Sequence, residues 1–429
     1  MRETIIRLFP RDEKFSFLFL AALVGAGGAI AAVLFRSTFV WLQHAIPHEG
    51  VGMVALAKAL PWWGRMLLPT FGGLVGGLIL KFGLHWVQRR GADDYMEAVT
   101  IGDGRVGVRS TLLKALSSLC CIASGASIGR EGPMVQLAAM FGSVVGRFLK
   151  LPRNLSQTLV ACGATAGIAS AYNAPIAGAV FVPEVGMGFS SKTLLGTLII
   201  SSVVADMVVR WLLNLDAVYK MPAFTMISGW EVFAYAGLGV ICGFAAPLFR
   251  WILDRSREVF IKIPVALPVQ MAIGGLGVGI ISIWMPEVWG NGYSVVNSIL
   301  HNPWTWQALL ALLVLKVLAT ALCSGSGMIG GVFTPSLFVG AALGAVYGHF
   351  LTHFALLSGT EINGYVMVGM GAFLASVTYA PLMCILMIFE MTLSYDVVLP
   401  LMLACVVAHH IAQYVRPHSI YTQRNERKK

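Results

Sequence analysis

The feature that most constrains this chain is a glycine- and proline-bearing motif that occurs twice. Residues 124–133 read SGASIGREGP, and residues 326–335, 202 positions later, read SGMIGGVFTP. In each copy the proline is followed by a long uncharged stretch. Proline is well tolerated in the first turn of a helix, and glycine can adopt the backbone angles of a tight turn just before the helix. Each copy therefore predicts a helix start. Two such starts directed at one place would form an anion site, because a helix N-terminus carries partial positive charge.

The segments around these motifs are apolar enough to lie in lipid. Of the 429 residues, 57% are hydrophobic and 12% are charged, and the mean hydropathy is +0.77. Apolar stretches near the ~20 residues of a spanning helix recur along the chain, and the shorter ones predict tilted or half-spanning helices. We therefore expect an all-α polytopic membrane protein. The stretches lie at roughly 15–35, 66–80, 133–146, 155–183, 193–205, 232–249, 263–286, 308–322, 327–348 and 364–389.

The positive charge of the chain predicts its orientation in the membrane. The formal net charge of +10 is carried largely by the two ends and short loops, and by the positive-inside rule both termini are expected in the cytoplasm. No basic patch interleaved with aromatic residues is present, so we expect no nucleic-acid partner. The seven cysteines lack metal-ligand spacing and are predicted to be small core residues, and no cofactor is expected. An enzyme would need a nucleophile with a base or a metal set, and the apolar segments hold none.

The internal duplication extends well beyond the glycine-proline motif. Residues 163–185 match residues 369–391 at an offset of 206, and glycine-rich segments near 72 and 274 match at 202. We therefore predict one membrane domain over 1–429, made of two homologous halves at about 15–215 and 230–415, with no cytosolic regulatory domain. Membrane proteins built from such repeats bind substrate where the halves meet, on discontinuous helices.

Glu131 stands at the start of the first predicted helix, within the run GREGP. An ionisable side chain at that depth in a membrane is costly and usually has a role in transport. The simpler alternative is a carboxylate that caps a helix N-terminus. The two interpretations agree, because a carboxylate there occupies the place that a free anion would take. We predict that Glu131 closes the site and that its protonation or movement opens it, which would link anion movement to protons.

The second copy of the motif has no carboxylate. In Gly331-Val332-Phe333-Thr334-Pro335 the predicted anion ligands are the backbone N–H groups of Val332 and Phe333, since the first amides of a helix lack helical partners. Lys114, seventeen residues before Glu131, is alone in LLKAL. It is either a buried positive charge near the anion path or a lysine that extends to the membrane interface.

Together these motifs resemble those of the CLC family of chloride channels and proton/chloride antiporters. The resemblance covers nearly the whole apolar part of the chain. It implies an inverted repeat of tilted and broken helices, a homodimer in the inner membrane, and chloride bound by helix N-termini. The motifs that carry it are GREGP at 129–133, the GxFxP pattern at 331–335, Asn173-Ala174-Pro175, Tyr379-Ala380-Pro381, Phe389-Glu390-Met391-Thr392, and Tyr421, which follows Glu390 by 31 residues.

The resemblance also implies residue roles. Glu131 looks like the gating glutamate, and Tyr421 looks like the tyrosine whose hydroxyl donates to the central anion. Lys114 is similar to the buried lysine ahead of the gate. The backbone around the anion is implied to come from Arg130, Gly132, Val332 and Phe333.

Two positions depart from the family pattern. Asp93 falls near the place of a serine whose hydroxyl contacts the anion in the family, and a carboxylate there would repel chloride. Val185 stands where antiporters of the family often carry a proton-transfer glutamate, with Glu184 beside it. The expected function is chloride transport through a pathway gated by Glu131. The alternatives are a tightly coupled proton/chloride antiporter and a variant that prefers another small anion such as fluoride or nitrate.

Overall fold

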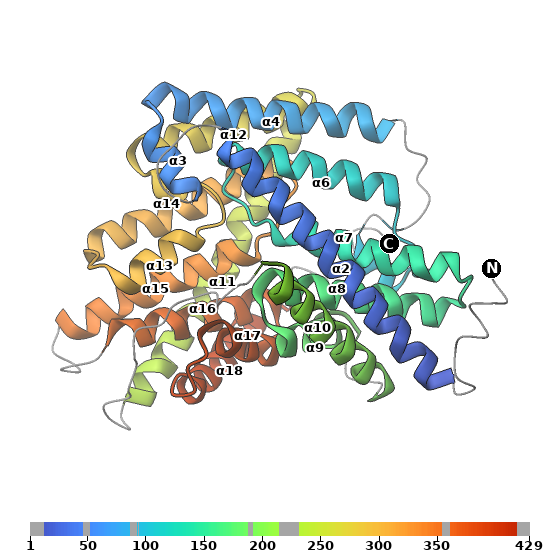
Figure 1. The fold of residues 1–429 in the computed structure, drawn as a ribbon. Coiled ribbons are helices and arrows are strands. Elements are labelled where there is room, and N and C mark those ends of the chain that lie inside the picture. The colour runs from blue at the N-terminus through green and yellow to red at the C-terminus, as the bar shows by residue number, and fades with distance from the viewer. Residues whose placement is uncertain are drawn as a thin grey trace. The chain divides into compact units, whose positions relative to one another are not determined.

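The computed structural model describes residues 13–45, 52–85, 92, 94–187, 192–213, 231–353 and 361–417. Over these ranges the chain is helical, and the only extended pairing is two isolated bridges, Ala92 with Val106 and Gly129 with Gly331 (Figure 1). The expected all-α class is therefore confirmed.

The described residues form a succession of helices, two of which contain an internal proline, Pro69 and Pro247. The first ones are α2 (Glu13–His44), α3 (Met53–Ala59), α4 (Trp62–His85), α5 (Tyr95–Thr100), α6 (Val108–Ala123), α7 (Glu131–Phe148), α8 (Arg153–Tyr172), α9 (Pro175–Val182), the π-helical turn η1 (Pro183–Met187) and α10 (Lys192–Leu213). The later ones are α11 (Glu231–Lys262), α12 (Leu267–Trp284), the 3₁₀ turn η2 (Pro286–Val288), α13 (Tyr293–His301), α14 (Trp306–Gly325), α15 (Phe333–His353), α16 (Ile362–Thr378), α17 (Pro381–Thr392) and α18 (Val398–Val415).

Helix length and composition identify a multi-pass membrane protein. Among the described residues, eight helices are long and apolar enough to cross a bilayer, and three apolar helices are shorter. The short ones begin or end at backbone breaks, as expected for discontinuous membrane helices, whose freed polar groups must be satisfied within the protein.

The cysteines are all free thiols, and all but Cys120 are buried, in agreement with the prediction.

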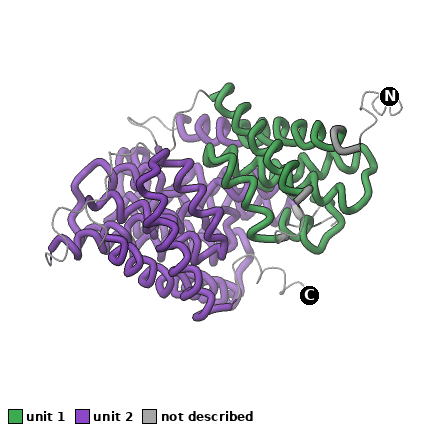
Figure 2. Tube along the Cα trace, turned by 90° about the horizontal axis from the view of Figure 1, so that it is seen from below, with its two compact units in different colours: residues 1–34, 89–111, 134–216 green, residues 35–88, 112–133, 217–429 purple. Residues whose placement is uncertain are grey.

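The chain forms two compact units (Figure 2). The first comprises residues 1–34, 89–111 and 134–216, and the second comprises 35–88, 112–133 and 217–429. These units do not coincide with the predicted halves, because two segments of the first half belong to the second unit. The half boundaries therefore stay predictions.

The first unit is held together by small residues that let helices approach closely. Ala29, Ala166, Ala169, Ala205 and Val209 form a fully buried cluster on α2, α8 and α10. α7 and α8 pack backbone to backbone, since a Cβ on Gly142 would lie 2.2 Å from the Leu159 carbonyl oxygen. Packing of this kind stabilises helices in lipid, where no hydrophobic force drives them together.

Within the second unit, α4 and α12 lie side by side and contact each other in a reciprocal pattern (Figure 1). A Cβ on Gly73 would lie 2.4 Å from the Met271 oxygen, and one on Gly275, its counterpart 202 residues later, would lie 2.1 Å from the Pro69 oxygen. Met271 is likewise the counterpart of Pro69. The contacts run forward on α4 and backward on α12, so the matched helices are antiparallel. Such a pattern is that of an inverted repeat.

Two other matched segments share an unusual backbone conformation. Asn173 ends α8 with φ of 52°, and Tyr379 ends α16 with φ of 60°. Each is followed by an alanine and then by the proline that begins α9 or α17. Non-glycine residues seldom adopt this left-handed conformation, so its recurrence reflects the duplicated sequence rather than chance.

The α4–α12 contact predicts that Gly275→Ala lowers the stability of the protein. The added methyl would overlap the Pro69 carbonyl, and overpacking of this kind typically costs about 1–3 kcal/mol. Thermal unfolding of detergent-purified protein measures the effect. Gly196→Ala on α10 is the matched control, because no atom lies within 4 Å of its Cβ position. Equal unfolding temperatures for the two variants would contradict the close packing.

Candidate functional site

The two copies of the glycine-proline motif meet within the second unit. The Gly129 N–H donates to the Gly331 oxygen at 2.7 Å, and the Gly331 N–H donates to the Gly129 oxygen at 2.8 Å. This antiparallel pair joins matched residues of the two copies, as the inverted repeat requires. It places the starts of α7 at Glu131 and of α15 at Phe333 next to each other.

The sequence explains why helices start there. Gly125 and Gly327, matched in the two copies, have φ of 108° and 92°, values that favour glycine. Pro133 and Pro335 are the third residues of α7 and α15, where a missing N–H costs no helical hydrogen bond. The positive ends of both helix dipoles therefore lie at the paired glycines.

The Glu131 side chain is buried at this junction, with only 4% of its surface exposed. A Cβ on Gly129 would lie 1.9 Å from Glu131 Oε2, and one on Gly331 would lie 3.4 Å from the same atom. The carboxylate thus occupies space that only glycine leaves free. Asn291 Nδ2 donates to Glu131 Oε1 at 3.4 Å, whereas Oε2 is buried without a hydrogen-bond partner among the described residues.

This carboxylate is weakly held for a buried charge. Removing a carboxylate from water costs several kcal/mol. A well-formed hydrogen bond to a charged group returns about 1.5–3 kcal/mol, but the 3.4 Å bond from Asn291 is longer than normal, and a helix N-terminus returns about 1 kcal/mol. An unsatisfied buried oxygen in a folded protein therefore calls for an explanation.

The remaining predicted anion-site residues surround this junction or lie outside the described ranges. A Cβ on Gly132 would lie 3.2 Å from the Gly331 nitrogen. Phe333 is the first residue of α15, and Val332 directly precedes it. The Arg130 guanidinium packs over the Phe39 ring at 5.7 Å. Asp93 and Tyr421 are outside the described residues.

Sequence reasoning missed two residues that bear on this site. One is Asn291, which gives the carboxylate its hydrogen bond, and the other is Lys316, which is completely buried and donates to backbone oxygens just before Asn291. Lys316 is the counterpart of Lys114 at the offset of 202, so the repeat could have identified it. Lys114 itself is only half-buried on α6.

Tyr293, the first residue of α13, follows Asn291 in this region. Burial raises the pKa of its phenol to about 12, while the nearby Arg130 and Arg36 guanidinium groups act in the opposite direction. The hydroxyl is therefore protonated at neutral pH.

A polar cluster anchors the end of α18, ahead of Tyr421. The buried Arg250 donates to the Tyr379 hydroxyl at 3.3 Å, and its guanidinium lies 5.5 Å from the centre of that ring. Tyr379 in turn donates to the Arg416 carbonyl, and the Arg416 side chain pairs with Asp254 at 2.5 Å. Arg416, which precedes Tyr421 in the sequence, is thus held in place by Tyr379 and Asp254.

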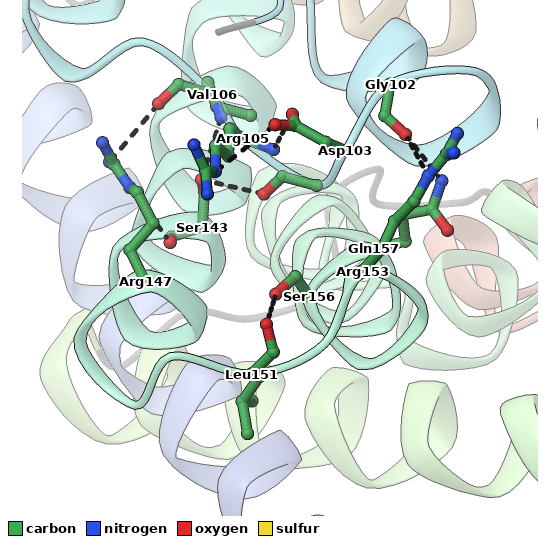
Figure 3. A network of polar contacts seen from close by, with 11 residues as sticks. Gly102, Asp103, Arg105, Val106, Ser143, Arg147, Leu151, Arg153, Ser156 and Gln157 are labelled. Atoms are coloured by element: carbon green, nitrogen blue, oxygen red, sulfur yellow. Dashed lines mark hydrogen bonds and ion pairs between the residues drawn. The ribbon is translucent and has the colours of Figure 1, made fainter.

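In the first unit, the loop between α5 and α6 is fixed by polar side chains from α7 and α8 (Figure 3). Ser143 Oγ accepts from the Val106 N–H at 2.8 Å. Arg153 Nε and Gln157 Nε2 donate to the Gly102 oxygen at 3.1 and 2.9 Å. These contacts hold the segment that follows the short helix α5. At the other end of α5, the Asp94 side chain accepts from the Met96 N–H at 3.1 Å.

The chain is similar to known proteins in sequence and in fold. The family profile described as voltage gated chloride channel matches residues 71–413. A protein of Ralstonia nicotianae named as a ClcB-like chloride channel is 54% identical over 412 residues, 95% of this chain and 96% of that protein. The voltage-gated ClC-type chloride channel ClcB of Salmonella typhimurium is 38% identical over 414 residues, 95% and 99% of the two chains. The solved structure of a slow cyanobacterial Cl⁻/H⁺ antiporter shares the fold, with a TM-score of 0.83 at 24% identity, covering 96% and 97% of the two chains.

The position of the carboxylate predicts a coupling between Gly129 and Glu131. Gly129→Ala should destabilise the protein because the methyl overlaps Glu131 Oε2, whereas in a Glu131→Ala background the same substitution should be much better tolerated. Thermal unfolding of the four proteins gives the coupling, expected at about 1–3 kcal/mol. Additive effects would show that the carboxylate is not at Gly129.

Proposed function

Because this chain belongs to the voltage gated chloride channel family, we propose that it carries chloride through a pathway whose gate is the Glu131 carboxylate. The observation that supports this gate is the buried Glu131 Oε2, which has no hydrogen-bond partner among the described residues and lies where two helix N-termini meet. Chloride transport by a multi-pass membrane protein follows from the family. The roles of the individual residues are proposed below.

The gate works by competition for one place. In the closed state the Glu131 carboxylate occupies the position of an anion at the starts of α7 and α15. When the carboxylate is protonated or swings away, its negative charge leaves and chloride can enter the same positive region. Gly129 and Gly132, on either side of the gate, leave room for that movement.

We propose that the anion is held mainly by backbone groups. Val332 and Phe333 would supply N–H donors from the start of α15, and Arg130 and Gly132 would supply them from the start of α7. The Tyr421 hydroxyl would donate to the central anion. Asp93 would be the inner gate, and its negative charge would lower chloride occupancy unless the side chain turns away. That position is also the reason to test fluoride and nitrate.

The coupling to protons is the second part of the proposal. Val185 favours a channel or a loosely coupled exchanger, because it cannot carry a proton. Tightly coupled antiport is the alternative, which the neighbouring Glu184 supports: it is acidic, half-buried, and lies in the π-helical turn η1, an element often found at functional sites. Proton uptake driven by an outward chloride gradient would distinguish the two.

The proposed assembly is a homodimer in the inner membrane with both termini in the cytoplasm. Each subunit would hold its own chloride pathway, surrounded by membrane lipid, and no cofactor would be needed. The basic residues at both ends of the chain support the orientation.

Glu131→Gln tests the gate. The amide cannot ionise, so chloride efflux from proteoliposomes should persist but lose its dependence on pH. Any proton transport driven by chloride should also stop. Retained pH dependence or retained proton pumping in this variant would overturn the assignment.

Tyr421→Phe tests the central anion site. The substitution removes only the hydroxyl, and a hydrogen bond to a charged group is worth about 1.5–3 kcal/mol, so chloride affinity should fall by about tenfold or more. Titration calorimetry with chloride measures it in detergent. An unchanged affinity in a folded variant would show that Tyr421 does not contact the anion.

A further inference from the structure

A fully buried lysine holds the loop next to the gate. Lys316 on α14 has no exposed surface, and its Nζ donates to the carbonyl oxygens of Val288 and Gly290 at 2.9 and 2.7 Å. The ammonium also lies 5.1 Å from the centre of the Phe338 ring. Among the described residues, no carboxylate pairs with Lys316 within 4.0 Å. A buried cation that is satisfied by backbone carbonyls and one ring fixes those carbonyls in place.

The same loop is confined on its other sides. Trp289 is fully buried, and a Cβ on Gly125 would lie 2.6 Å from its ring. Gly290 and Gly292 have φ of 67° and 92°, and a Cβ on Gly292 would lie 2.4 Å from the Phe338 ring. A buried tryptophan, two glycines and the lysine therefore restrain the backbone conformation of the loop between η2 and α13.

Asn291 projects from this loop to the gate in a fixed orientation. Its Oδ1 accepts from the Tyr293 N–H at 3.3 Å, so its Nδ2 faces Glu131 Oε1, 3.4 Å away. This amide is the only hydrogen-bond donor to the Glu131 carboxylate among the described residues. The closed position of the carboxylate thus depends on where the loop holds one side chain.

The repeat gives an independent reason to assign Asn291 to the pathway. At an offset of 198, Asn291-Gly292-Tyr293 lies over Asp93-Asp94-Tyr95, and α13 and α5 both begin at the matched tyrosine. The residue two positions before each short helix is therefore matched. Repeats of this kind bind substrate where the halves meet, so the residue matched to the proposed inner gate Asp93 is a candidate for the pathway.

We propose that Lys316 is a positioning residue for the gate: by holding the carbonyls of Val288 and Gly290 it fixes Asn291, which holds the Glu131 carboxylate in its closed position. This inference rests on the proposed function of Glu131. Loss of either contact would weaken the closed state and increase chloride flux. A residue with a merely structural role would change flux equally whether or not the carboxylate is present.

The test is a double-mutant cycle measured as chloride efflux from proteoliposomes at neutral pH. Asn291→Leu, which keeps the size and removes the donor, and Lys316→Met should each raise the flux per protein about fivefold in the wild-type background, the factor expected for one hydrogen bond. In a Glu131→Ala background neither should change it. Asn291→Gln keeps a donor, so its flux should lie between that of Asn291→Leu and that of the wild type.

Two controls match these substitutions. Asn297→Leu removes an amide on α13 that donates to the Tyr293 carbonyl at 3.5 Å. Lys81→Met removes an exposed lysine on α4 whose Nζ lies 5.8 Å from the centre of the Phe82 ring. Both should leave the flux unchanged. If Lys316→Met does not fold, Gly290→Ala strains the same loop without removing a buried charge.

The outcomes separate the two proposals. Equal effects of Asn291→Leu in both backgrounds, or no effect in either, would overturn the positioning role. If Glu131→Ala itself leaves flux and its pH dependence unchanged, the gate assignment fails instead.

Discussion

The reciprocal backbone pairing of Gly129 and Gly331 is the interaction on which the rest of the site depends. It joins the two copies of the repeated motif at matched residues and brings the starts of α7 and α15 together. A side chain at Gly129 would collide with the Glu131 carboxylate. The same two glycines therefore pair the backbone of the two copies and bring two positive helix N-termini together. They also leave the space in which an acidic side chain or an anion can lie.

The repeat is symmetrical in its backbone and asymmetrical in its charges. α4 and α12 exchange equivalent glycine contacts, yet only the first copy supplies a carboxylate and only the second supplies a fully buried lysine. The Glu131 carboxylate accepts one long hydrogen bond among the described residues, whereas Lys316 is held by two carbonyls and a ring. In this account one half contributes the movable part of the gate and the other contributes the support that holds it closed.

Much of this could be predicted from the sequence because it depends on local pattern. Apolar length gave the membrane helices, and glycine before proline gave the two helix starts, so Glu131 was identified as the candidate gate. Asn291 could not be found in this way, because its contact with Glu131 spans 160 residues and lies in no periodic segment. Lys316 was within reach, since it matches Lys114, but its burial depends on the packing of Trp289 and Phe338 around the loop.

The proposed gate requires that the Glu131 carboxylate occupies an anion site when it is closed. Bromide scatters anomalously and substitutes for chloride, so crystals of the wild type and of Glu131→Ala grown in bromide test it directly. A bromide peak is expected in the variant at the place vacated by the carboxylate, beside Gly129 and Gly331, and none is expected there in the wild type with its gate closed. A variant that binds bromide elsewhere in the pathway but leaves this place empty would contradict it.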